Sequence, residues 1–270
     1  MNDRYKLSQF YLGKETEVQY SNFQELNNDV YDVENLSIVS LAMDFPTGTS
    51  DKIRKEIERK WIDTLPKLEK VKALSVRHRV KQDFFEAICQ MPNLEQLFFW
   101  SSTAEDISSI AKLTRLQRLK LWSFTRLIDI SPLLYLRTLK VLSIDNCFKV
   151  ENYEVLGEMP WLIGLELCGD TFAPKYLRLN SLKPFISLKN LKHLDLSVAS
   201  IIDKSFESIL EMESLERLDL LAKMPTETRN KIKSNHKNLK AGFFMDYDFE
   251  KNEFYEGKNW ETGFTTGNGE

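Results

Sequence analysis

A repeated leucine pattern constrains the fold of this chain more than any other feature of its sequence. Each copy has an apolar residue, a second one three positions later and a third two positions after that. The copies begin at Val71, Leu94, Leu116, Leu139, Leu162, Leu191 and Leu215, and a degenerate eighth begins at Leu239. The spacing between successive starts is nearly constant, apart from one longer interval between Leu162 and Leu191. So regular a period predicts a repeat architecture with one supersecondary unit per copy.

The spacing within each copy predicts how the units are built. The second and third apolar residues are two positions apart, so both lie on one face of a short strand. One unit cannot bury its leucines alone, and neighbouring units must therefore stack, with their strands in one parallel sheet. Return segments 82–89 and 204–210 have apolar residues at helical spacing, whereas 128–133, with Pro132, suits a turn or a short 3-10 helix. The prediction is a curved α/β solenoid with strands on its concave face and short helices and turns on its convex face.

The repeats resemble the leucine-rich repeat family, whose units have about 20–29 residues, over positions 65–244. Segment 127–133, which runs into the leucines at 136, 139 and 142, is similar to the repeat type of bacterial internalins and of a cytosolic phosphatase-regulating relative, and 104–110 echoes it. The resemblance implies a right-handed horseshoe used as a binding scaffold. Internalins also carry an export signal and a wall anchor, neither of which is visible in this sequence. We therefore expect a bacterial type of protein that stays in the cytoplasm.

The flanks predict three regions. Residues 1–64 are expected to form an N-terminal cap with a first strand over 34–41 and a helix that begins after Ser50. The helix has an apolar stripe at Ile53, Ile57, Trp61 and Leu65, and it is expected on the convex side. Residues 65–246 form the solenoid of about eight repeats, and 247–270 form a C-terminal cap and a flexible tail. The aromatic residues of 243–260 are interpreted as cover for the last repeat, with a ligand-binding cluster as the alternative.

Composition excludes several classes of function. There are 37 Lys and Arg against 40 Asp and Glu, and the net charge is -3, so no overall positive field attracts nucleic acid or an anionic membrane. No apolar run is long enough to span a membrane, and the first residues lack the apolar core of a signal peptide. Three scattered cysteines, Cys89, Cys147 and Cys168, make no disulfide framework, which fits a reducing compartment.

The sequence has no recognisable catalytic, metal-binding or nucleotide-binding motif. The histidines, His78, His193 and His236, have no metal-binding spacing and are interpreted as solvated or satisfied side chains. No glycine-rich phosphate loop occurs, and Cys168 has no nearby base in the sequence to make it a nucleophile. The sequence therefore predicts no catalytic residue, no cofactor, no metal and no enzymatic activity.

The register of the repeats predicts which side chains face outward from the concave surface. One group is aromatic and basic and comprises Arg77, Phe98, Trp100, Arg118, Lys120 and Trp122. A second group continues the same surface with acidic residues, Asp145, Glu166, Asp195 and Asp219. Trp and Arg are enriched at binding hot spots. We therefore expect a monomer that binds a protein partner of opposite charge asymmetry on this face, with an inhibitor or immunity-type neutraliser as a specific form of that role.

Three alternatives stay open at this level. The tryptophans could pack against each other, or under the N-terminal segment, and bind nothing. Single-stranded nucleic acid could stack on Trp100 and Trp122, although the acidic group would repel its backbone. The repeats could also serve as the substrate-recognition scaffold of an effector or enzyme, although the flanks are short for a catalytic domain of about 100 residues.

Overall fold

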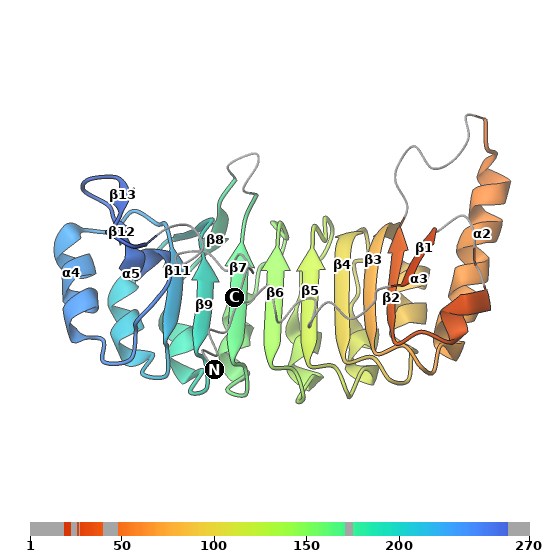
Figure 1. The fold of residues 1–270 in the computed structure, drawn as a ribbon, viewed down its shortest axis with the longest axis horizontal. Helices are drawn as coiled ribbons and strands as arrows, with labels where there is room; N and C mark the ends of the chain where they lie inside the picture. Colours follow the sequence, from red (N-terminus) through yellow and green to blue (C-terminus); the bar gives the residue numbers. More distant parts are fainter. Residues whose placement is uncertain (1–18, 23–25, 27, 40–47, 171–174, 259–270) are drawn as a thin grey trace.

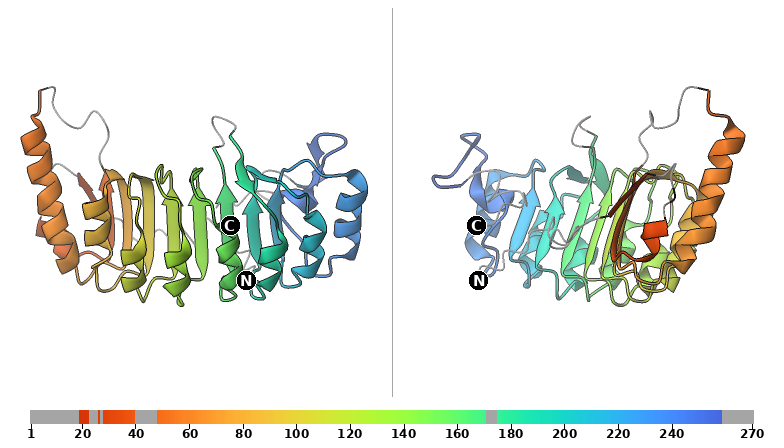
Figure 2. Two further views of the ribbon diagram at one scale, coloured as in Figure 1. Left: turned by 180° about the vertical axis from the view of Figure 1, so that it is seen from behind. Right: turned by 45° about the vertical axis from the view of Figure 1, so that its right-hand side comes forward.

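The computed structural model describes residues 19–22, 26, 28–39, 48–170 and 175–258. Nine strands form one parallel sheet in the order β1-β2-β3-β4-β5-β6-β7-β9-β11 (Figure 1). The strands are β1 (Gln19–Asn22), β2 (Asn35–Val39), β3 (Ala73–Val80), β4 (Gln96–Ser102), β5 (Arg118–Trp122), β6 (Val141–Asp145), β7 (Gly164–Cys168), β9 (His193–Leu196) and β11 (Arg217–Leu220). Figure 2 shows the return segments lined up behind this sheet. The fold is the α/β leucine-rich repeat solenoid that the repeats predicted.

The leucine register is confirmed strand by strand. Leu97 pairs with Leu119 and Leu119 pairs with Leu142, so equivalent leucines lie side by side across the sheet. These side chains are at most 2% exposed. Each buried leucine side chain contributes about 1.5–3 kcal/mol to folding. Stacking of equivalent positions therefore makes one continuous core from β2 to β11.

The return segments are mostly short 3-10 helices. They are η3 (Ser108–Lys112), η4 (Ser131–Tyr135), η5 (Tyr153–Glu158), η6 (Lys183–Ser187) and η7 (Phe206–Glu211). The helix expected over 82–89 is α3 (Gln82–Ile88), whereas the segment expected to be helical at 204–210 overlaps the 3-10 helix η7. In η4 the amide of Leu133 donates to the carbonyl of Ile130, three positions earlier. The short repeat unit leaves little chain for a longer α-helix, so the tighter helix closes the return.

The N-terminal region extends the sheet. Strand β2 lies within the predicted 34–41, and residues 40 and 41 are outside the described residues. It follows η1 (Asn28–Tyr31) and pairs with both β1 and β3. Helix α2 (Asp51–Thr64) begins as predicted, because the Ser50 hydroxyl accepts a hydrogen bond from the amide of Ile53 at 3.4 Å.

Only part of the predicted apolar stripe of α2 is buried. Trp61 and Leu65 are fully buried, the latter in η2 (Leu65–Lys67), whereas Ile53 is 47% exposed. Figure 1 shows why: the first turns of α2 rise beyond the edge of the sheet, where no neighbouring unit covers them. The apolar stripe is therefore buried at its C-terminal end and exposed at its N-terminal end.

The long repeat between β7 and β9 contains a small second sheet. Strand β8 (Leu177–Leu179) pairs in parallel with β10 (Ala199–Ile201), which belongs to the next repeat. The long repeat thus supplies one strand, and the next repeat the other, of an additional pair beside the main sheet.

The eighth repeat ends the solenoid differently from the prediction. After α4 (Thr226–Asn235), Ala241 makes an isolated bridge to Arg217, and no further strand joins the main sheet among the described residues. Gly242 has a φ of +100°, and a Cβ there would collide with the carbonyl oxygen of Leu218. This left-handed turn, which favours glycine, leads the chain away from the strand direction into α5 (Phe243–Asp246).

A hairpin of β12 (Tyr247–Asp248) and β13 (Glu253–Phe254) completes the C-terminal region. The rings of Phe243 and Tyr247 stack with centroids 4.4 Å apart, and Phe249 and Phe254 pack edge-on against Phe243. The aromatic residues thus pack on one another beside β11. The three-region division stays a prediction, and residues 259–270, with Trp260 and the expected tail, lie outside the described residues. No helix in the described part of the chain has the length and apolarity needed to cross a membrane.

Candidate functional site

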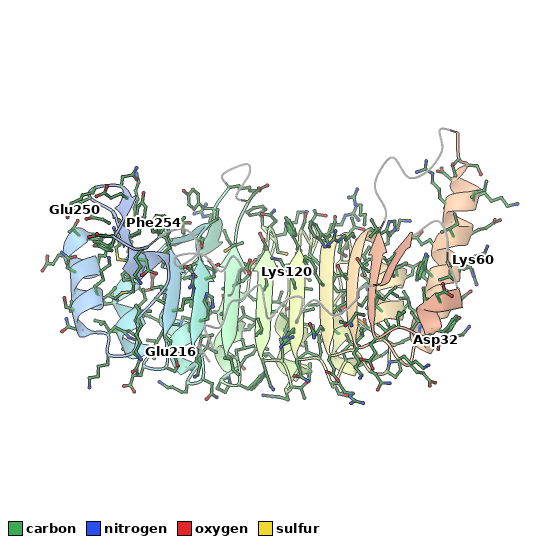
Figure 3. The ribbon with its side chains drawn as sticks, in the orientation of Figure 1. Asp32, Lys60, Lys120, Glu216, Glu250 and Phe254 are labelled. Atoms are coloured by element: carbon green, nitrogen blue, oxygen red, sulfur yellow. The ribbon has the colours of Figure 1, made fainter. Side chains whose placement is uncertain are left out.

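The predicted columns of the concave face exist as cross-strand ladders. The middle column runs through directly paired residues from β3 to β11: Ser75, Phe98, Lys120, Ser143, Glu166, Asp195 and Asp219. Directly paired side chains on one face of a sheet lie about 5 Å apart and therefore interact. Figure 3 places Lys120 in the centre of the sheet. The contacts on this face are therefore set by which side chains are neighbours along each column.

An aromatic cluster occupies the part of this face formed by β3, β4 and β5. The ring centroids of Trp100 and Trp122 are 4.7 Å apart with an interplanar angle of 33°, and those of Phe98 and Trp100 are 5.2 Å apart. The guanidinium of Arg77 lies 4.9 Å from the centroid of Trp100, within cation–π range. Arg77 is exposed, and the three aromatic residues are half-buried. We call Arg77, Phe98, Trp100 and Trp122 the aromatic cluster.

Lys120 joins the aromatic cluster to the acidic residues. Its Nζ lies 5.7 Å and 5.4 Å from the ring centroids of Phe98 and Trp122, and 3.4 Å and 3.7 Å from carboxylate oxygens of Glu166 and Asp145. Burial opposes its protonation, but the two carboxylates outweigh burial and raise the pKa of Lys120. The predicted basic and acidic groups are thus linked by a largely buried ion pair, and Lys120 is held by the protein's own carboxylates. Nearby, burial lowers the pKa of the half-buried Arg118, with Glu95 opposing that shift.

Two acidic residues predicted to be exposed on this face are buried. Glu166 is 8% exposed, and Asp219 is fully buried. Asp219 accepts hydrogen bonds from Arg217 Nε at 2.9 Å and from the amide of Phe243 at 2.7 Å, and it lies 3.0 Å from His193 Nε2. Asp219 therefore anchors the start of the C-terminal region to the sheet. Its assignment to an exposed binding surface was wrong, because Phe243 returns to cover the last strand.

Asp145 and Asp195 are half-buried and have raised pKa values. Burial, followed by repulsion from Glu166, raises the pKa of Asp145 to about 7. Burial, followed by repulsion from Asp219 and Glu166, raises the pKa of Asp195 to about 8, although the amide of Ser197 donates to its carboxylate at 2.9 Å. The closely spaced carboxylates therefore share an environment that favours their protonated form.

The cysteines and histidines have structural environments. All three cysteines are buried, and burial raises the pKa of Cys168 well above the ordinary thiol value. The ring of His78 packs against Phe84 of α3 with centroids 5.9 Å apart, and burial and Lys81 lower the pKa of His78 to about 4. His236 is buried and satisfied, because its Nδ1 accepts a hydrogen bond from the amide of Leu239. Within the described ranges, no three His, Cys, Asp or Glu side chains are grouped to hold a metal ion.

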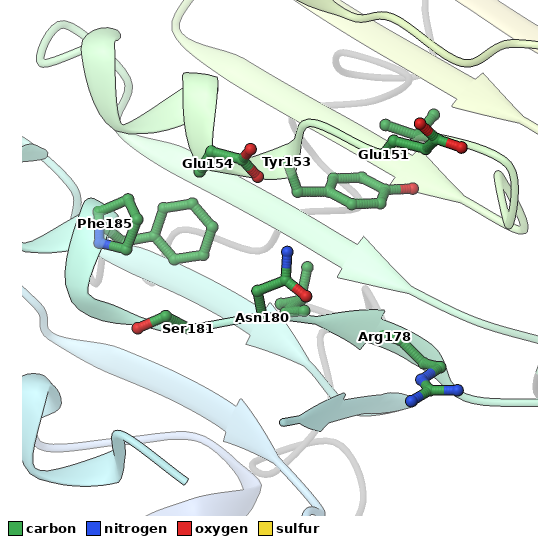
Figure 4. A pocket seen from close by; sticks show the side chains of 10 residues that line it. Glu151, Tyr153, Glu154, Arg178, Asn180, Ser181 and Phe185 are labelled. Atoms are coloured by element: carbon green, nitrogen blue, oxygen red, sulfur yellow. The ribbon is translucent and has the colours of Figure 1, made fainter. Parts of the chain in front are cut away.

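A pocket of about 390 Å³ lies between η5 and the long repeat (Figure 4). Figure 4 shows Tyr153 and Glu154 on one side of it and Asn180, Ser181 and Arg178 on the other. The Tyr153 hydroxyl donates to the carbonyl of Cys147 at 2.8 Å, so its polar group serves the fold. No local sequence pattern predicts this pocket, because it depends on how the long repeat folds back. Its lining mixes carboxylates with one guanidinium and does not select a ligand.

Comparison with known proteins supports the fold. No protein-family model matches the sequence, and a comparison with curated proteins finds no match. Among solved structures, an internalin from Listeria monocytogenes is similar over 77% of this chain and 60% of its own, with 18% identity and a TM-score of 0.52. A leucine-rich repeat protein of Leptospira interrogans is similar over 80% of this chain and 51% of its own, with 20% identity and a TM-score of 0.51. The chain thus spans about half to three fifths of these proteins and shares their repeat fold.

Proposed function

We propose that this leucine-rich repeat solenoid is a non-enzymatic module that binds a protein partner on its concave face, centred on the aromatic cluster. The observation that carries the proposal is the pair Trp100 and Trp122, which lie side by side, half-buried, on adjacent strands with Arg77 beside them. Half-exposed aromatic rings on a rigid sheet offer a large contact area at a low cost in side-chain entropy. Truncation of such residues at interfaces costs about 2 kcal/mol or more of binding free energy.

The charged residues of the concave face restrict the kind of protein partner that it can bind. Arg77 and Arg118 lie on the β3–β5 part of the face, and the half-buried Asp145 and Asp195 lie further along. A partner surface that is acidic over the first part complements the arginines. A basic group over the second part would favour the ionised form of Asp145 and Asp195 and pair with it. Glu166 and Asp219 are omitted from the proposed contact surface because they are buried.

Single-stranded nucleic acid is the less favoured ligand. Stacking on Trp100 and Trp122 would need nearby cations for the phosphates. Lys120 already lies within 3.7 Å of two carboxylates, which would repel a continuing phosphate backbone. The same arrangement is compatible with a protein partner that brings both signs of charge.

A role as an inhibitor or immunity-type neutraliser in a bacterial cytoplasm is the specific form we favour, with the protein acting as a monomer. It rests on analogy between small repeat solenoids. An effector or enzyme that uses the repeats to recognise a substrate is the competing form, and it predicts turnover that a Glu166→Ala variant would lose. Turnover of that kind in a hydrolase or transferase screen would overturn the non-enzymatic proposal.

The test compares capture of partners by the wild type and by a double variant, Trp100→Ala with Trp122→Ala. Purified proteins are immobilised and exposed to lysate of the source organism, and bound proteins are quantified by mass spectrometry. A protein retained by the wild type should be lost from the double variant. The matched control is Tyr135→Ala, which removes a 70% exposed aromatic residue from the convex side. Equal capture by the wild type and the double variant would refute the proposed face.

A further inference from the structure

A row of side chains ties repeats to the preceding repeat at the edge where the strands begin. In most repeats the residue that precedes the first apolar position donates a hydrogen bond to a main-chain carbonyl of the preceding unit, whereas Arg115 donates to the side chain of Asn93. Asn93, Thr138, Asn190, Ser214 and Asn238 make this bond with donor–acceptor distances of 2.7–2.9 Å. All five side chains are small and polar, so this link needs only a short donor.

Trp161 is an exception in this row. Its Nε1 donates to the carbonyl of Leu136 at 3.1 Å, so it makes the same type of bond, but its indole adds a half-buried apolar surface that the bond does not need. Two positions later, Ile163 is also half-buried. The equivalent positions of the other repeats are polar or charged: Lys72, Glu95, Gln117, Lys140, Lys192, Glu216 and Lys240. The inner part of the Trp161 indole packs against the hydrophobic core, whereas its exposed part, with Ile163 beside it, gives this edge an apolar surface at positions that are polar in the other repeats.

Cations surround this apolar surface. Trp161 and Ile163 line a pocket of about 470 Å³ together with Arg137, Lys140 and Lys192. The guanidinium of Arg137 lies 4.3 Å from the centroid of the Trp161 ring. Lys192 pairs with Glu216 at 3.0 Å, and Figure 3 labels Glu216 at this edge of the sheet. None of the residues that line the pocket in the described structure is acidic.

We infer that this pocket binds an acidic segment of a protein, with a carboxylate side chain at Arg137 and Lys140 and an adjacent apolar side chain on Trp161. Carboxylates complement the cations, and an apolar neighbour buries indole surface that otherwise contacts water. A free inorganic anion would use the cations but leave the apolar floor exposed. The site lies at the edge of the sheet rather than on its concave face, and this inference does not depend on the proposed function.

The repeats themselves supply variants that separate binding from folding. Trp161→Asn installs the residue that three other repeats use for the same link, and Ile163→Lys installs a residue found at the equivalent position of four others. Both should fold and should have circular dichroism spectra like that of the wild type. Arg137→Gln and Lys140→Gln remove charge alone. Lys237→Gln, at an exposed lysine in the last repeat, is the matched control.

The probe is the capped peptide acetyl-Leu-Glu-Leu-Glu-amide, added to ¹⁵N-labelled full-length protein and followed by two-dimensional NMR. We expect saturable shifts at the amides around Ile163, binding about tenfold weaker in Trp161→Asn and several-fold weaker in each charge variant, and no change in Lys237→Gln. The uncharged peptide acetyl-Leu-Gln-Leu-Gln-amide should not bind at the same concentration.

Three results would overturn the inference. They are the absence of saturable shifts with the acidic peptide, equal affinity in Trp161→Asn, and equal affinity of inorganic phosphate or glutarate. The last result would identify a site for small anions instead. Loss of binding in Trp100→Ala with Trp122→Ala, but not in Trp161→Asn, would place the peptide on the concave face and would refute this pocket.

Discussion

The two halves of the concave face have the same backbone register but opposite surface character. From β3 to β5, large rings stand over the sheet, and Trp100 and Trp122 stack on each other in a half-buried position. From β6 to β11, Val141, Ser143 and Gly164 are small, and the carboxylates form bonds within the protein. One repeat geometry can thus present a binding surface or build an internal polar network. Which of these it does depends on the side chains placed in the columns.

The difference also separates stability from recognition. Asp219 bonds to Arg217 and to the amide of Phe243, so its contacts hold the end of the solenoid together. The rings of the aromatic cluster contact one another and the cationic groups of Arg77 and Lys120. We therefore expect substitutions in the second half to affect folding most, and those in the first half to affect binding.

The largest loss of stability should follow Asp219→Ala. Removing this fully buried carboxylate deletes the acceptor that Arg217, His193 and the amide of Phe243 share, and the free energy of unfolding should fall by about 3–5 kcal/mol. Urea denaturation measures the change, with Glu213→Ala, at an exposed position, as the control. A loss below about 1 kcal/mol would mean that the two halves do not differ in this way.

Substitution of a core leucine should destabilise the protein equally in the two halves. Leu119→Ala in β5 and Leu194→Ala in β9 each remove a fully buried side chain of the same ladder, so both should lower the free energy of unfolding by about 2–5 kcal/mol and by similar amounts. Chemical denaturation of the two variants side by side tests this. Markedly unequal losses would show that the core beneath the two halves is packed differently.

Stability should depend on pH because of two carboxyl groups in the β6–β11 half of the face, Asp145 and Asp195. The pKa of Asp145 is about 7 and that of Asp195 is about 8, both above the unfolded value near 3.9, so the folded state binds protons more tightly there. Stability should therefore fall as pH rises from 6.5 to 8, by at most about 1.4 kcal/mol per pH unit for each proton. In this interval the lowered pKa values of His78 and His193 keep both histidines neutral in the fold, and their opposite effect fades as pH rises above their unfolded pKa near 6.5. Thermal melts of Asp195→Asn should show a flatter dependence, and an unchanged slope would contradict the assignment.

The smallest effect on stability should come from Trp100→Ala. The ring is half-buried and its contacts are with Trp122, Phe98 and Arg77, so we expect a loss of about 1–2 kcal/mol in the free energy of unfolding. Calorimetry of this variant beside Asp219→Ala ranks the two halves directly. A larger loss for Trp100→Ala would reverse the comparison and make the aromatic cluster part of the core.

Much of the fold could be predicted from local spacing. The period around Leu97, Leu119 and Leu142 predicted seven strands in correct register, because side chains alternate across a strand whatever surrounds it. The cap at Ser50 follows from the same kind of local rule. Gly242 escaped the prediction because its left-handed backbone is required only by the close approach to Leu218.

The candidate site was predicted only in part. The contact between Trp100 and Trp122 follows from the strand register. The pocket around Trp161 could not be predicted, because it depends on hydrogen bonds between neighbouring repeats. The register of a strand determines on which face of the sheet a side chain lies. Whether that side chain is exposed depends on segments far away in the chain.

By itself, the sequence determined the leucine-rich repeat solenoid, the order of its strands and the columns of the concave face, since these follow from a period of two along each strand and from the need of each unit to bury its leucines. Only the tertiary structure decided that Lys120 is held by Glu166 and Asp145, and that Asp219 lies beneath Phe243. The physical reason is that charge pairing and burial depend on distances between residues separated by one or two whole repeats, which no local period specifies.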